Sequence, residues 1–168
     1  MLILLRLLHI LGGVFWAGTL IFVALFLEPS VREAGPDGAK VMQALLRRKY
    51  LIILPLVALI TIVAGILLLQ RVSGGFDPLF MRSRTGMALS IGGGVAIIAF
   101  LIGVLVMRPA VMRLSKVMSQ AGQSEGAAKA ALMAEADGLR RRMRLGGRWV
   151  AGLLTVTVLT MAVARYLV

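Results

Sequence analysis

The stretch LHILGGVFWAG, residues 8–18, lies inside a long apolar run and contains His9, the only histidine of the chain. An ionisable side chain in hydrocarbon is costly unless it is paired, so such a residue usually marks a functional site. At about 100° per residue, a helix places Gly13 and Trp16 each within about 40° of His9. The stretch therefore predicts a helix face that carries an imidazole, a gap left by a small residue, and a large aromatic ring. A flat apolar ligand fits that geometry.

Four apolar runs organise the rest of the chain. The sequence is 60% hydrophobic with a mean hydropathy of +0.94, which is outside the range of soluble domains. A helix needs about 20 apolar residues to cross a bilayer, and helices satisfy their own backbone groups in lipid. We therefore expect an all-α integral membrane protein, a four-transmembrane-helix bundle that forms a single domain over residues 1–168. The expected spans are residues 2–27, 50–70, 86–107 and 149–168.

The positive charge is distributed asymmetrically between the two sides of this predicted bundle. Of the 19 Lys and Arg residues, five lie in residues 28–49 and nine in residues 108–148, which leaves five for the other side. The positive-inside rule then places both basic segments in the cytoplasm and both termini outside. We expect these segments to contact anionic lipid heads, with an acidic protein partner as the alternative. Nucleic acid is not expected as a partner, because aromatic residues do not interleave with the arginines.

An internal repeat is visible at an offset of eighty residues. The matched positions are Gly12-Gly13 with Gly92-Gly93, and Pro29-Ser30-Val31 with Pro109-Ala110-Val111. The second and fourth spans also begin alike, at Lys49-Tyr50 and Arg148-Trp149. We therefore expect two repeated helical hairpins, in halves of about residues 1–71 and 82–168, related by an axis along the membrane normal.

The connections between spans also carry helical signals. Asp37 is placed to cap a short helix over residues 39–49. The third span is expected to continue to Met118 with a kink at Pro109. After a flexible break, an Ala-rich helix is expected to end near Gly146-Gly147, before the fourth span begins.

Several kinds of chemistry are excluded by composition. The chain has no cysteine, so disulfides, iron–sulfur clusters and covalently attached c-type haem are ruled out. No Ser–His–Asp arrangement, carboxylate pair or phosphate-binding loop is present. A single histidine without a carboxylate in the membrane offers too few ligands for a metal site other than haem.

Two interpretations of His9 remain open. In one, the neutral imidazole bonds a carbonyl or hydroxyl of a facing helix. In the other, it is an axial ligand of haem b, held by a hydrogen-bond acceptor on its second nitrogen. Arg6 would then lie near a haem propionate, and Met87, or Met161, would be the sixth ligand unless the iron is five-coordinate or shared between two copies. The predicted cofactor site has His9 as metal ligand and is completed by Arg6, Gly12, Gly13, Trp16 and Met87.

The sequence also resembles a group of small bacterial four-helix membrane proteins. The resemblance rests on residues 7–10 (LLHI), 15–18 (FWAG), Pro29 and the basic segment Leu45–Tyr50. The group includes the membrane domain of the copper-resistance protein CopD, HemJ-type protoporphyrinogen oxidases and uncharacterised relatives. The resemblance covers about the first 110 residues well and the rest by hydropathy alone. It implies that the first-helix histidine, here His9, binds haem b.

Two features of the HemJ-type enzymes are absent. Their third-helix lysine is replaced here by Thr85-Gly86-Met87, and residues 28–32 lack their second histidine. The resemblance therefore implies haem binding and a redox or accessory role without implying protoporphyrinogen oxidase activity. Two alternatives stay open: a cofactor-free accessory subunit of a larger membrane complex or homo-oligomer, and a protein that handles copper or a small solute.

Overall fold

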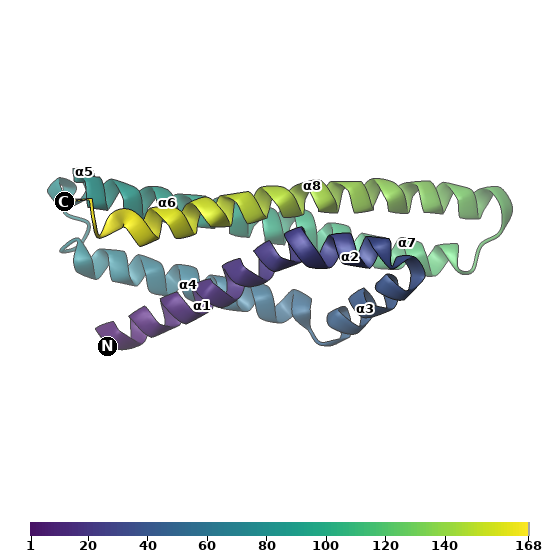
Figure 1. The fold of residues 1–168 in the computed structure, drawn as a ribbon, viewed down its shortest axis with the longest axis horizontal. Coiled ribbons are helices and arrows are strands. Elements are labelled where there is room, and N and C mark those ends of the chain that lie inside the picture. Colours follow the sequence, from purple (N-terminus) through teal and green to yellow (C-terminus); the bar gives the residue numbers. More distant parts are fainter. Residues whose placement is uncertain (168) are drawn as a thin grey trace.

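The computed structural model describes residues 1–167, and helices form the architecture of that region (Figure 1). The elements are α1 (Leu2–Phe22), the π-helical turn η1 (Val23–Leu27), α2 (Glu28–Glu33), α3 (Gly35–Arg47), α4 (Tyr50–Val72), α5 (Pro78–Arg82), α6 (Arg84–Ile102), the π-helical turn η2 (Gly103–Met107), α7 (Arg108–Ala121) and α8 (Gly126–Ala164).

Four continuous helical segments are long and apolar enough to cross a membrane, which confirms the prediction of four such helices. In each, only 11–28% of the most apolar window is buried inside the protein. Most of the apolar side chains therefore face outward, as they do in helices surrounded by lipid. The segments are Leu2–Glu33, Tyr50–Val72, Arg84–Ala121 and Gly126–Ala164.

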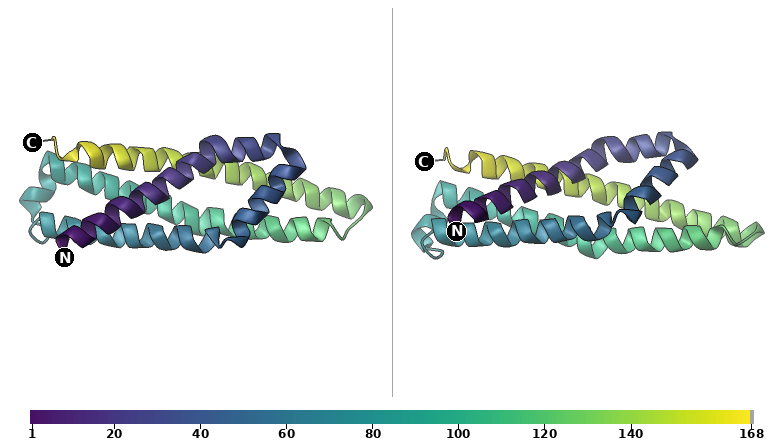
Figure 2. Two further views of the ribbon diagram at one scale, coloured as in Figure 1. Left: turned by 60° about the horizontal axis from the view of Figure 1, so that its bottom comes forward. Right: turned by 90° about the horizontal axis from the view of Figure 1, so that it is seen from below.

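The helices pack as two antiparallel pairs. Helix α1 packs on α4, α6 packs on α8, and the pairs meet where α1 touches α8 and α4 touches α6. The N-terminus and the end of α8 lie at the same end of the molecule, and α7 pairs with the first half of α8 at the other end (Figures 1 and 2). Helix α3 runs back from α2 to the start of α4, so it closes the first hairpin on that side.

The core where all four helices meet is built mainly from small side chains. It contains Trp16 and Ala17 of α1, Leu54 and Ala58 of α4, Ala96 and Ala99 of α6, and Val150 and Leu154 of α8. Small residues let helix backbones approach closely, which is how helices associate when lipid is as apolar as the side chains. Trp16 is the one large ring in the cluster and meets Phe100 edge to face, with ring centroids 6.4 Å apart.

A π-helical turn precedes each of the two matched prolines. In η1 the backbone N–H of Glu28 donates to the carbonyl of Val23, and in η2 that of Arg108 donates to Gly103. A proline has no N–H and its ring collides with the carbonyl four residues earlier, and the wider π turn relieves that collision. The predicted continuation of the third span past Pro109 to Met118 is confirmed, since α7 ends at Ala121.

Two local predictions are wrong. Helix α8 does not end near Gly146-Gly147 but continues to Ala164. Gly146 is needed within the helix because it makes room for Met107: a Cβ added at Gly146 would lie 2.5 Å from the Met107 sulfur. Asp37 does not cap α3, whose N-cap is Ala34. Its carboxylate instead accepts a 2.7 Å ion-paired hydrogen bond from Lys40 within the first turn.

The core position of Trp16 gives a stability prediction. Trp16 is 4% exposed, so Trp16→Ala leaves a cavity and should cost about 3 kcal/mol. Trp149, which is 70% exposed, is the matched control, and Trp149→Ala should cost less than about 0.5 kcal/mol. Denaturant titration in mild detergent, followed by circular dichroism, measures both. Equal losses would contradict the assignment of Trp16 to the core.

Candidate functional site

His9 is hydrogen-bonded across the α1/α4 interface. Its Nδ1 lies 2.9 Å from the backbone carbonyl oxygen of Thr61. A carbonyl can only accept, so Nδ1 carries the proton and donates. In the neutral imidazole the lone pair is then on Nε2. Among residues 1–167, no hydrogen bond to Nε2 of His9 is seen.

Helix α4 offers His9 a surface that a larger residue would block. The imidazole lies against Gly65, where an added Cβ would be 2.7 Å from Cε1 and 2.9 Å from Nδ1 of His9. Thr61 is buried, and its hydroxyl donates to the carbonyl of Val57 at 2.8 Å. Thr61 therefore keeps its own side chain satisfied while its carbonyl accepts from His9.

The gap beside His9 is occupied by the neighbouring helix. A Cβ at Gly12 would collide with the Thr61 hydroxyl, and one at Gly13 would lie 3.7 Å from the Thr61 methyl group. Both glycines thus bring α1 close to α4 at Thr61. In the isolated chain this part of the predicted cofactor surface is a helix contact.

The other predicted site residues are dispersed. Trp16 is buried in the four-helix core against Phe100, away from any surface on which a macrocycle could stack. Arg6 is exposed near the start of α1. Met87 is 47% exposed on α6, which meets α1 through Phe100 and Trp16, thirteen residues further along α6. Met161 contacts Gly92 in the α6/α8 interface. Both methionines therefore lie on the second hairpin, Met87 on α6 and Met161 on α8.

His9 nevertheless faces the inner side of the bundle. It lies seven residues, and so about two turns, before Trp16, which points the two side chains in nearly the same direction. Trp16 is 4% exposed, whereas His9 is half-buried. The imidazole is therefore more exposed than the indole, although the two side chains point in nearly the same direction.

Sequence reasoning did not identify the two residues of α4 that hold His9. Thr61 is the only threonine, and Gly65 the only glycine, between residues 50 and 70. Thr61 and Gly65, one helical turn apart in a run of apolar residues, were the available signal. Pairing them with His9 required knowledge of which helix faces α1.

Two further features bear on a ligand. Within residues 1–167, no three His, Asp or Glu side chains come together to hold a metal ion. An apolar groove of about 370 Å³ runs along α1 and α4, lined by Leu4, Leu7, Leu8, Leu11, Gly12, Val57 and Ile60. His9 does not line this groove.

Comparison with known proteins adds no family to this description: no family model, curated protein or solved structure matches the chain.

The hydrogen bond to Thr61 predicts the tautomer of His9. Because the chain has one histidine, labelling with ¹⁵N-histidine gives a spectrum of that residue alone. At neutral pH in detergent, we expect Nδ1 to be protonated and Nε2 bare. A proton on Nε2 with Nδ1 bare would contradict the bond to the carbonyl of Thr61.

The contact with Gly65 predicts a second effect. Gly65→Ala should push the imidazole off the Thr61 carbonyl, change the His9 ¹⁵N shifts and lower stability by about 1 kcal/mol. Gly18, on the same helix as His9, has no atom within 4 Å of an added Cβ. Gly18→Ala should therefore leave the shifts unchanged and stabilise the helix by up to about 1 kcal/mol. Unchanged His9 shifts in Gly65→Ala would refute the packing.

Proposed function

We propose that the protein is a multi-pass protein of a bacterial inner membrane, with both termini on the periplasmic side. Four long apolar helices and their outward-facing side chains support insertion. The charge distribution supports the orientation, and the two chain ends at one end of the bundle agree with it.

We further propose that the fold consists of two related hairpins. The turns η1 and η2 are offset by eighty residues, as are Gly12 and Gly92. Gly12 contacts the Thr61 hydroxyl, and Gly92 would place a Cβ 2.6 Å from the Thr160 hydroxyl. Thr61 and Thr160 are 99 residues apart, the same offset as Tyr50 and Trp149 at the starts of the two return spans. The same contact thus recurs at matched positions.

Within this bundle, we propose that His9 is the axial ligand of a haem b. The observation that carries the proposal is the hydrogen bond from Nδ1 to the Thr61 carbonyl. Histidines that bind metal commonly donate their second ring N–H to a carbonyl, which fixes the tautomer and orients the ring. We propose a five-coordinate iron, because His9 offers Nε2 as a ligand nitrogen and the two candidate methionines, Met87 and Met161, lie on α6 and α8.

The chain's own residues would have distinct roles in that site. Thr61 holds the imidazole in the tautomer that can ligate, and Gly65 leaves room for the ring. Arg6, exposed on the turn before His9, is placed to meet a propionate near the membrane surface. A bound haem b supplies one-electron redox chemistry, so the role would be redox or accessory to a redox complex.

A second function is favoured by the closed contact at Gly12. Since Thr61 fills the gap beside His9, the imidazole also works as a packing residue in a protein without a cofactor. The protein would then be an accessory subunit that fits against a larger membrane complex or a second copy of itself. The structure offers less support for copper handling, because no additional ligands gather around His9 among the described residues.

Visible spectroscopy separates the two functions. The protein is produced with haem supplied, purified in mild detergent, and measured oxidised and then reduced with dithionite. We expect a Soret band and sharp reduced α and β bands that are lost in His9→Ala. Met87→Leu is the matched control and should retain the bands, because Met87 is 47% exposed on α6 and the proposed ligand is His9 alone. A wild-type protein that stays colourless would overturn haem binding and favour the accessory role.

A further inference from the structure

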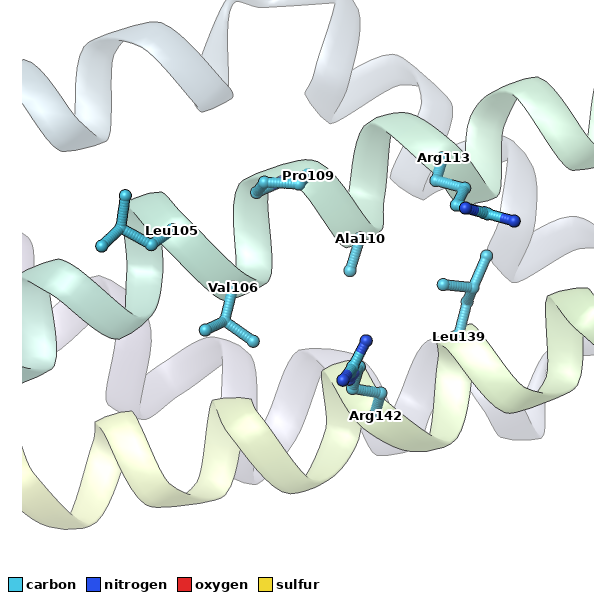
Figure 3. Close-up of a pocket in the computed structure, with 7 residues that line it drawn as sticks. All are labelled: Leu105, Val106, Pro109, Ala110, Arg113, Leu139 and Arg142. Atoms are coloured by element: carbon cyan, nitrogen blue, oxygen red, sulfur yellow. The ribbon is translucent and has the colours of Figure 1, made fainter.

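A pocket of about 240 Å³ lies between α7 and the first half of α8, immediately after the π turn η2 (Figure 3). Its position follows from the sequence. The π turn and Pro109 redirect the third span as it leaves the apolar run. Ala110, which is 7% exposed, has a small side chain and so leaves space between the helices. The pocket is therefore a product of the bend at the end of the span.

The two ends of the pocket differ in chemistry. Leu105 and Val106 of η2, at the end of the apolar run, form one end and are 66% and 42% exposed. Arg113 of α7 and Arg142 of α8 flank the other end, and Figure 3 shows Arg142 reaching from α8 into the space between the helices. An apolar region thus leads into a pair of cations over a few turns of helix.

The charge at this site is only partly neutralised by the chain. Residues 108–148 contain nine Lys and Arg but three Asp and Glu. Arg113 donates to Glu135 at 2.7 Å, and Arg140 donates to Asp137 at 2.9 Å. Among residues 1–167, no ion pair is recorded for Arg142. The guanidinium that enters the pocket is therefore available to an anion.

We propose that this pocket binds an anionic phospholipid of the cytoplasmic leaflet. The phosphate is held by Arg142 with help from Arg113, since guanidinium groups match phosphate oxygens in geometry and charge. An acyl chain lies along Leu105 and Val106 toward the bilayer. The assignment rests on the proposed membrane insertion and orientation, which place the end of the apolar run at the cytoplasmic interface, and it is independent of haem.

Lipid titration of the purified full-length protein tests the assignment. Thermal stability is followed in a neutral detergent as phosphatidylglycerol, phosphatidylcholine or glycerol phosphate is added. Only phosphatidylglycerol should stabilise the protein in a saturable way. Arg142→Gln should weaken its apparent affinity about fivefold, the effect of one basic residue near a lipid surface. Arg141→Gln removes the same charge from the next position, which does not line the pocket, and should change the affinity less than twofold.

Each other result overturns the assignment. Equal effects of the two lipids would mean that charge does not select the ligand, and a response to glycerol phosphate would mean a free phosphate site. Equal losses in the two Arg variants would mean a diffuse charge effect. Circular dichroism of Arg142→Gln checks folding. Alkaline carbonate extraction of cell membranes tests insertion separately, and the visible spectrum tests haem separately.

Discussion

The close approach of paired helices through small residues is the constraint on which the rest of this structure depends. In lipid, apolar burial alone does not bring helices together, because lipid solvates apolar side chains as well as another helix does. Contacts at Gly12 and Gly92 allow the backbones to come near enough for hydroxyl groups to pack against them. The same approach puts the imidazole of His9 within reach of a main-chain carbonyl on α4. Packing and the polar site therefore have a common origin.

Pro29 and Pro109 determine the helix arrangement at the end of the molecule that lies away from the N-terminus. Each proline follows a π turn, so the helix changes direction without ending. In the first hairpin, the short helix α2 is followed by α3, which leads back to the start of α4. In the second, α7 continues and pairs with the extended first half of α8, which exposes a basic helical hairpin beyond the apolar core. The same π turn before a proline thus leads into two different helical arrangements at this end of the molecule.

Much of this fold could be predicted from the sequence, because apolar length and proline position act locally. The four spans and the helix through Pro109 follow from such signals. The uninterrupted α8 could not be predicted, since Gly146 ends a helix by itself but is retained within one when Met107 fills the space above it. The candidate site divides in the same way. His9 could be identified because it is an ionisable residue in an apolar run. The roles of Thr61 and Gly65 depend on which helices are neighbours, and the hydropathy of the sequence does not determine which helices pack together.

The proposed relation between the two hairpins bears on why position 9 is a histidine. With offsets of 80 and 99 residues, His9 and Gly65 correspond to Leu89 and Ala164 of the second hairpin. There, Leu89 is half-buried and Ala164 is 2% exposed, so apolar residues occupy both matched positions in a well-packed pair. Helix packing at this level does not require an imidazole. The hydrogen bond to Thr61 uses Nδ1, and ligation would use Nε2, so the packing contact and a ligand role are compatible. The difference between the proposed hairpins at His9 therefore agrees with the proposed function, which needs the second nitrogen.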